Sequence, residues 1–432
     1  MSKDEGMSKA SVIASLALLI IAISIVQATL STMSESLAYS RLQRSVNVKP
    51  EPPNLPILKA ERQIALQAIS DAERVLKSPL INSSVRSEVR SLIAMARSYL
   101  NQSNAGQALG AALKALAEAY AQLYAAKASS QGLKAVTNEL KGMYASLINE
   151  LKSFNATVFK AASEKHSLSY IVSNLAYAQY FTDYAWRILR AGNYSLALLL
   201  KGNGSKIEVM IATRGYVLAD RLLRLAKTCL SMPDPWHEPR LTAKEAAKYL
   251  ISIASKTIEK TYNFVQPFTV GTRLLSMASE LITSANDAVH SGRYAVASYY
   301  ALMAYAYARA AGKLSNSLYE SDYFNITISS GAVAAKRAES LNAYINAFKN
   351  STSPIAGMLL LNSWSDIVSG DSNVVNCINA FCLHIGKVPL SSYNLVPAYI
   401  FYLRGEAMAS VAANLSKLIA GAASEASAGS KG

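Results

Sequence analysis

The longest stretch of the chain without proline extends from Leu80 to Met232. Proline lacks a backbone N–H and clashes with the preceding turn, so a stretch free of it can hold several helices joined by short turns. Here and in most of the remaining chain, apolar residues recur every three or four positions, the period of a helix with one buried face. Alternating strand-like patterns are scarce, and Phe324–Ile328 is the best candidate. The sequence therefore predicts an all-α protein.

The helical period is clearest in nine ranges. The first carries its stripe on residues that include Ile57, Glu61, Ile64 and Ala68. All the stripes are rich in alanine, whose small side chain allows helices to approach closely. The ranges are Ile57–Leu76, Val85–Leu100, Ala108–Ala128, Leu168–Leu189, Ile207–Leu230, Ala243–Phe264, Leu274–Val289, Tyr294–Leu314 and Ala332–Phe348.

Three glycines lie between helical stretches, each within a short motif around Gly106, Gly192 or Gly292. Glycine readily takes the left-handed conformation that ends a helix, so we expect each to join two antiparallel helices. Gly292-x-Tyr294-x-x-Ala297 resembles the turn and second helix of a tetratricopeptide repeat. The glycines are 86 and 100 residues apart, not at multiples of about 34. We therefore predict antiparallel helical hairpins stacked as an irregular bundle or solenoid, not that family.

The segment Ala10–Leu30 contains no charged residue. About 20 apolar residues in a helix match the roughly 30 Å hydrocarbon core of a bilayer, which predicts a transmembrane signal anchor. One alternative is a cleavable signal peptide ending at Val26-Gln27-Ala28. Another comes from Glu5-Gly6-Met7-Ser8, which resembles the processing site of archaeal type IV pilin-like precursors, although Lys9 departs from the usual apolar start.

Eight Asn-x-Ser/Thr sequons indicate where the bulk of the chain lies, because chance predicts only about four. Long domains cross the membrane whatever their charge, so flanking lysines and arginines decide little. We expect a single-pass protein of the cytoplasmic membrane with an extracytoplasmic body. The possible glycosylation sites are Asn82, Asn101, Asn155, Asn193, Asn203, Asn325, Asn350 and Asn414.

Prolines and composition divide the chain into consecutive regions. Pro50, Pro52, Pro53 and Pro56 form a stiff stalk after the membrane segment. The predicted regions are a tail (1–9), the transmembrane anchor (10–30), a juxtamembrane helix end with the Pro-rich stalk (31–56), a helical domain (57–231), a Pro-rich loop (232–240), a second helical region (241–349), a C-terminal helical region (350–421) and a flexible tail (422–432).

The composition is hydrophobic (51%) and poor in charge (16%), with a net charge of +15. Ordinary globular proteins are about 25% charged, and the balance excludes an intrinsically disordered chain. Three cysteines are too few for a disulfide scaffold. The chain has four histidines and no Walker A, Rossmann, His-Glu-x-x-His or Gly-x-Ser-x-Gly motif. We expect no catalytic residue, cofactor or metal, and hence no enzyme.

The three cysteines, Cys229, Cys377 and Cys382, are candidates for a disulfide, which an oxidising exterior permits. In a helix Cys377 and Cys382 would lie about 140° apart, which disfavours a bridge between them. Buried free thiols and a metal site with His384 are the alternatives. In the Pro-rich loop, Asp234, His237 and Glu238 are candidate ligands, although a solvated turn is the commoner arrangement.

Two kinds of surface feature point to partners. The basic residues form stripes, which can attract lipid head groups, acidic envelope glycans or acidic proteins. The alternative is that each stripe is simply a solvated helix face. The tyrosines gather on two helices, where they can stack on sugars or bases, although helix packing is the simpler role. The stripes are Arg221, Arg224 and Lys227; Lys244, Lys248, Lys256 and Lys260; and Lys336-Arg337. The tyrosines are Tyr170, Tyr177, Tyr180 and Tyr184, and Tyr299, Tyr300, Tyr305 and Tyr307.

The lack of catalytic motifs, the anchor, the stalk and the sequons together predict a function. We expect a membrane-anchored extracytoplasmic helical scaffold or interaction protein of the cell envelope. It would contact the bilayer through residues 10–30 and bind protein or anionic envelope partners. The alternatives are a pilin-like or filament-associated subunit and a basic module that binds a ligand or nucleic acid. Nucleic acid is the least expected partner, because no nucleic-acid-binding fold is recognisable.

Overall fold

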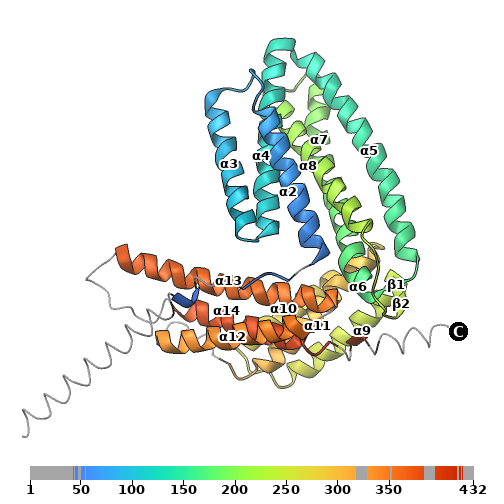
Figure 1. Cartoon of the computed structure of the whole chain (residues 1–432). Helices are drawn as coiled ribbons and strands as arrows, with labels where there is room; N and C mark the ends of the chain where they lie inside the picture. The colour runs from blue at the N-terminus through green and yellow to red at the C-terminus, as the bar shows by residue number, and fades with distance from the viewer. Residues whose placement is uncertain are drawn as a thin grey trace, which may run out of the picture. The chain divides into compact units, whose positions relative to one another are not determined.

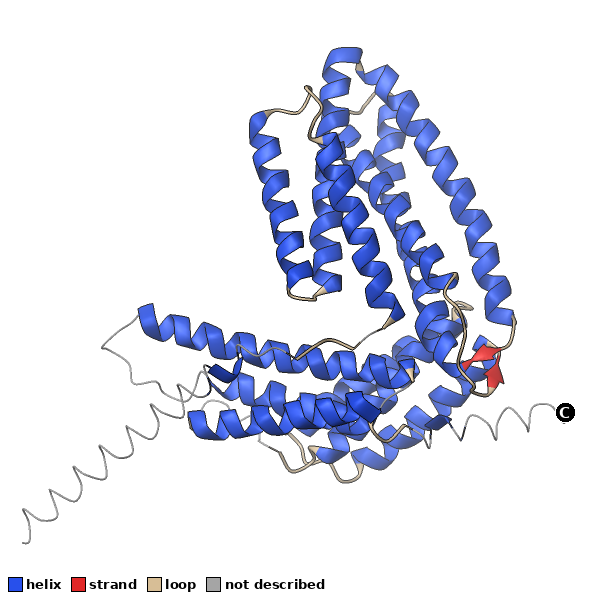
Figure 2. Cartoon of the chain, viewed as in Figure 1, coloured by secondary structure: helices blue, strands red, loops and turns tan. Residues whose placement is uncertain are grey.

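The computed structural model describes residues 42, 44–46, 50–53, 55–317, 328–350, 353–383, 395–415, 418, 419 and 421, without the side chains of 377–383. Most of these residues are helical, and the helices pack in bundle-like fashion (Figures 1 and 2). The prediction of an all-α protein is confirmed. The predicted anchor, Ala10–Leu30, lies outside the described residues, and among the described helices none is long and apolar enough to cross a membrane.

The described residues fall into two compact units. The larger holds those within 51–317, 346–362 and 407–421, and the smaller holds those within 42–50, 318–345 and 363–406. Each unit combines segments far apart in the sequence, which a division of the chain into consecutive ranges does not express.

Helices and one short strand pair build residues 55–317 of the larger unit (Figure 1). The elements are α2 (Pro56–Val75), α3 (Ser83–Asn101), α4 (Ala105–Gln131), α5 (Leu133–Ser163), β1 (His166–Ser167), α6 (Leu168–Tyr170), the π-helix η1 (Ile171–Leu175), α7 (Ala176–Leu200), α8 (Lys206–Leu230), β2 (Arg240–Leu241), α9 (Ala243–Tyr262), α10 (Val270–His290) and α11 (Tyr294–Lys313).

Capping residues explain where several helices begin. Ser205 and Thr242 start α8 and α9, and each forms a reciprocal capping box with a glutamate three residues later. The hydroxyl accepts a hydrogen bond from a backbone N–H in the first turn, and the glutamate accepts one from the backbone N–H of the capping residue. These N–H groups have no partner inside the helix. Asn82 caps α3, where its side chain accepts a hydrogen bond from Val85 N at 2.9 Å. These local signals fix the helix starts independently of tertiary packing.

Small side chains hold the helices together. On α4, Ala108, Ala112, Ala115 and Ala119 are fully buried at spacings of four, three and four residues, and α4 packs against α2, α3 and α8. The same spacing recurs on α11, which packs against α9 and α10. The alanine stripes therefore form the core of the bundle, as the sequence predicts.

Of the three glycines expected to end helices, Gly292 does so. It follows α10 with φ at +71°, the left-handed conformation in which glycine avoids the strain of a β-carbon. The expectation is wrong for Gly106, which is the second residue of α4, because Ser103 takes the left-handed position after α3 with φ at +57°. It is also wrong for Gly192, which lies inside α7; Gly202, with φ at +76°, lies in the turn between α7 and α8.

Gly192 has a different role, which is the close approach of α7 and α8. A β-carbon on Gly215 of α8 would lie 3.1 Å from Gly192 Cα and 3.2 Å from the carbonyl oxygen of Ile188. A β-carbon on Gly192 would lie 3.1 Å from Cε1 of Tyr216. The two backbones therefore pack so closely that a β-carbon at either position would make a tight contact with the facing helix.

Two segments far apart in the sequence are joined by a short antiparallel strand pair. His166 pairs with Leu241 and Ser167 with Arg240. The strand expected at Phe324–Ile328 lies outside the described residues except for Ile328.

Three further helices are α12 (Ser330–Asn350), α13 (Pro354–Leu383) and α14 (Val396–Ala412). In the smaller unit, Arg337 of α12 forms a buried bidentate pair with Asp371 of α13, with Nε–Oδ1 at 2.7 Å and Nη2–Oδ2 at 2.9 Å. The Tyr402 hydroxyl of α14 donates to Asp371 Oδ1 at 2.8 Å. One charged network therefore joins all three helices.

Candidate functional site

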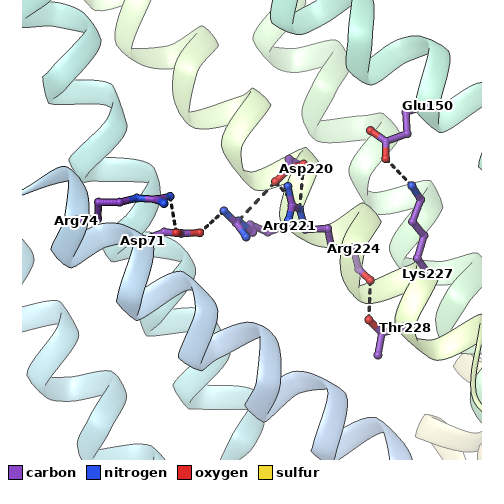
Figure 3. Close-up of polar contacts among 8 residues, drawn as sticks. All are labelled: Asp71, Arg74, Glu150, Asp220, Arg221, Arg224, Lys227 and Thr228. Carbon is purple, nitrogen blue, oxygen red and sulfur yellow. Dashed lines mark hydrogen bonds and ion pairs between the residues drawn. The ribbon is translucent and has the colours of Figure 1, made fainter.

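A chain of ion pairs connects α2 to α8 (Figure 3). Arg74 Nη2 lies 2.6 Å from Asp71 Oδ1, and Arg221 Nη2 lies 2.5 Å from Asp71 Oδ2. Asp220 continues the chain, with its Oδ2 3.5 Å from Arg221 Nε and 3.0 Å from Arg224 Nε. Cations and carboxylates therefore alternate from one helix to the other.

This arrangement accounts for the first of the predicted basic stripes. Arg221 and Arg224 are paired with carboxylates, and Lys227 pairs with Glu150 of α5 (Figure 3). A cation that already faces a carboxylate contributes little to the attraction of a further anion. The α8 stripe therefore ties helices together and does not present a free basic surface.

The other two predicted stripes differ from each other. Lys336 pairs with Glu339 and Glu406, and Arg337 pairs with Asp371, so this stripe is neutralised within the smaller unit. The lysines of α9 are exposed and have no carboxylate within ion-pair distance among the described residues; they are Lys244, Lys248, Lys256 and Lys260. The α9 stripe therefore remains a solvated basic face.

A strongly basic groove lies between α2 and α3, outside the three predicted basic stripes. It has a volume of about 1220 Å³, and its lining includes five basic side chains and one acidic side chain, Glu73. The basic residues are Arg74 and Lys77 of α2 and Arg86, Arg90 and Arg97 of α3. We refer to this surface as the α2–α3 groove.

Only part of this charge is compensated. Arg97 Nη2 pairs with Glu73 Oε1 at 2.7 Å, and Arg74 pairs with Asp71. Arg86 donates to the Ser78 carbonyl oxygen at 2.9 Å, and its buried Nε has no hydrogen-bond partner in the described part of the chain. Lys77 and Arg90 are exposed and face no carboxylate there either. The groove therefore carries a net positive charge open to solvent.

The sequence held a signal for this groove. Arg86, Arg90 and Arg97 are four and seven residues apart, which places them within about 40° of one another around a helix. They extend about 16 Å along its axis, at 1.5 Å per residue. Arg74 and Lys77 line the same groove because α2 packs beside α3, and sequence spacing does not reveal this packing.

Of the three candidate ligands in the Pro-rich loop, His237 is exposed, whereas Asp234 and Glu238 are engaged in hydrogen bonds within the protein. Asp234 accepts hydrogen bonds from the backbone N–H and hydroxyl of Ser167, at 3.1 and 2.6 Å. Glu238 accepts the equivalent pair from Ser169, at 2.8 and 2.5 Å. The two carboxylates satisfy backbone donors at the start of α6, where the helix dipole favours negative charge. No group of metal-ligating side chains occurs among the described residues.

Cys229 is buried on α8 and forms no disulfide within the described part of the chain. Burial raises the pKa of its thiol to about 12, so the reactive thiolate is strongly disfavoured. Cys377 and Cys382 both belong to α13. Five residues of helix separate them by about 140°, the arrangement that disfavours a bridge between these two.

The sequons occupy different environments. Asn155 and Asn193 lie within α5 and α7 and are partly buried, and Asn325 lies outside the described residues. Five asparagines are exposed: Asn82, Asn101, Asn203, Asn350 and Asn414. Asn101 also lines the α2–α3 groove.

The predicted tyrosine faces converge in part. Tyr177 and Tyr180 of α7 line one cavity together with Tyr299 and Tyr300 of α11. Tyr170 is buried and donates to the Leu230 carbonyl oxygen at 2.9 Å, so it serves packing.

Comparison of the chain with protein-family models, curated proteins and solved structures found no match.

Proposed function

We propose that this protein is a membrane-anchored, extracytoplasmic scaffold of the cell envelope whose α2–α3 groove binds an acidic glycan. The observation that carries the proposal is the charge of the groove, where Lys77, Arg86 and Arg90 have no carboxylate partner among the described residues. Anions are attracted to a concave surface of one charge sign more strongly than to scattered charges. A non-catalytic binding role also agrees with the lack of catalytic motifs in the sequence.

The spacing of the charges favours a linear polymer as the partner. Arg86, Arg90 and Arg97 form a row about 16 Å long on α3, and Lys77 supplies charge from α2. A chain with repeated negative charges can follow such a row and release counterions at each contact. A flat lipid surface fits a convex basic face better, and here the exposed lysines of α9 would serve it.

The membrane address rests on the uncharged segment Ala10–Leu30 and the excess of sequons. Adding protease to intact cells tests it. An extracytoplasmic body is degraded before lysis, and glycosidase treatment lowers its apparent mass if the exposed sequons are occupied. A body protected from protease until the cells are lysed would overturn the proposed location.

Binding to heparin, a linear acidic glycan, tests the groove directly. We expect the full chain in detergent to bind heparin with an affinity that falls steeply as salt rises, because screening shortens the range of the attraction. The double variant Arg86→Gln/Arg90→Gln should weaken binding at least about tenfold, which corresponds to about 1.4 kcal/mol. The matched control, Lys256→Gln/Lys260→Gln, removes the same charge from exposed positions of α9.

Equal losses in the two double variants would show that net charge alone, not the groove, attracts the polymer. Tighter binding of duplex DNA than of heparin would favour the alternative of a nucleic-acid-binding module. Glu5-Gly6-Met7 before the apolar segment supports the remaining alternative, a pilin-like subunit. Mass spectrometry of the mature N-terminus separates the pilin-like subunit from the anchored scaffold, because a processed pilin-like protein would start at Met7 and an anchored protein at Met1 or Ser2.

A further inference from the structure

A second cavity lies in the larger unit, between α2, α7 and α11. Its volume is about 380 Å³, within the range of small-molecule sites. Aromatic rings form much of its lining, and Glu61 is the one acidic residue there. None of the described side chains that line it is cationic. The aromatic residues are Tyr177, Tyr180, Phe181, Tyr299 and Tyr300.

The rings form one connected group. The ring centroids of Tyr177 and Tyr299 lie 5.8 Å apart. The ring centroids of Tyr299 and Tyr300 lie 5.9 Å apart, and those of Tyr177 and Phe181 lie 6.0 Å apart. Aromatic faces carry partial negative charge, and several of them around one space attract a cation.

Glu61 supplies a negative charge in the same space when it is ionised. Its carboxyl group forms no hydrogen bond or ion pair with any described residue. Burial raises its pKa from 4.5 to about 7. The other ionisable side chains that line the cavity are tyrosines, and none of them can supply a positive charge. Among the residues that the structure describes, the carboxylate therefore has no counter-ion, and a cationic ligand could provide one.

The surroundings of the cavity include the π-helix η1 and the start of α4. The π-helix η1 directly precedes Ala176 and Tyr177, and π-helical turns are frequent at functional sites. A β-carbon at Gly106, near the start of α4, would lie 3.8 Å from Glu61 Oε2. A divalent metal would need several oxygen ligands, whereas this cavity offers one carboxylate.

We propose that this cavity binds an organic cation, a quaternary ammonium or protonated amine, with Glu61 as the counter-ion and the tyrosine rings around the charge. A sugar could stack on the same rings, but it would not need an ionised carboxylate. A neutral apolar ligand would leave Glu61 without a partner. The inference does not depend on the acidic glycan, because the α2–α3 groove and this cavity share no lining residue.

Isothermal titration of the full chain at about pH 8 tests the proposal with choline, methylammonium and 3,3-dimethylbutanol, the uncharged carbon analogue of choline. One of the two cations should bind at least about tenfold more tightly than the alcohol, a difference of about 1.4 kcal/mol. Glu61→Gln should remove this preference while leaving binding of the alcohol unchanged. Lowering the pH to about 5 should weaken cation binding to the natural protein, because Glu61 takes up a proton.

Two further measurements keep the result interpretable. Tyr300→Leu removes one ring at a partly exposed position and should weaken cation binding without abolishing folding, which a thermal melt monitors. Glu88→Gln, at an exposed position of α3, is the matched control and should change nothing. Equal affinity for the better-bound cation and the alcohol, unchanged cation affinity in Glu61→Gln, or no saturation with either cation up to about 10 mM would overturn the proposal.

Discussion

Replacing Glu61 with glutamine should stabilise the protein at alkaline pH, because the natural protein keeps an unpaired carboxylate in the cavity. Folding raises the pKa of Glu61 from 4.5 to about 7. Each pKa unit corresponds to about 1.36 kcal/mol, so the ionised side chain lowers the free energy of unfolding by about 3 kcal/mol. A neutral amide of the same shape removes this cost.

The direction of the pH dependence follows from proton binding. Below about pH 4.5 the carboxyl is protonated in both the folded and the unfolded state, and it has no effect on the pH dependence. Between the two pKa values the folded state binds more protons, so stability falls as the pH rises. Above about pH 7 the cost is complete. We expect Glu61→Gln to exceed the natural protein by about 3 kcal/mol at pH 8 and by less than about 1 kcal/mol at pH 5.

Urea denaturation followed by circular dichroism at both pH values measures these free energies. Glu88→Gln of α3 controls for the loss of one surface carboxylate and should shift stability by less than about 0.5 kcal/mol. The reasoning is refuted if Glu61→Gln gives the same small, pH-independent change as Glu88→Gln. An excess of choline should reduce the advantage of Glu61→Gln if the cavity binds cations.

Three further substitutions test the packing. Gly292→Val should cost more than about 1 kcal/mol in a thermal melt, because a β-branched residue is strained at positive φ, whereas Ser291→Val beside it should cost less than about 0.5 kcal/mol. Gly215→Ala should destabilise by about 1–3 kcal/mol by overpacking against α7, whereas Gly142→Ala, with open space on α5, should stabilise by about 0.5–1 kcal/mol in the same melts. Asp371→Asn breaks the buried pair of the smaller unit and should lower the free energy of unfolding in urea by about 3–5 kcal/mol.

Local sequence determined the helices and several of their ends. The apolar period places α8 at Ile207–Leu230, and the helix begins one residue earlier, at Lys206, because Ser205 and Glu208 form the capping box. Short-range interactions of this kind are complete within a few residues, so a sequence pattern contains them.

Gly106 and Gly192, which the sequence pattern wrongly placed at helix ends, show the limit of such patterns. Gly192 lies between apolar stretches, as a helix-ending glycine would, and its sequence motif is close to that of Gly292. The difference is Gly215, which packs against it from the next helix. Glycine suits both a left-handed turn and a close helix crossing, and only the tertiary contact distinguishes them.

The basic residues follow the same logic and bear on function. Arg221, Arg224 and Lys227 on α8 have the spacing of a binding stripe, yet Asp71 of α2 and Glu150 of α5 reach two of them, and the third pairs with an aspartate of α8 itself. Arg86 and Arg90 on α3 have an equivalent spacing, and no carboxylate reaches them from the neighbouring helix within the described residues. Whether a row of cations holds the fold together or stays available to a partner depends on which carboxylates the fold brings beside it. The uncompensated charge therefore lies on α3 rather than α8, and exposed Arg90 is the position where a substitution should weaken binding without loosening the bundle.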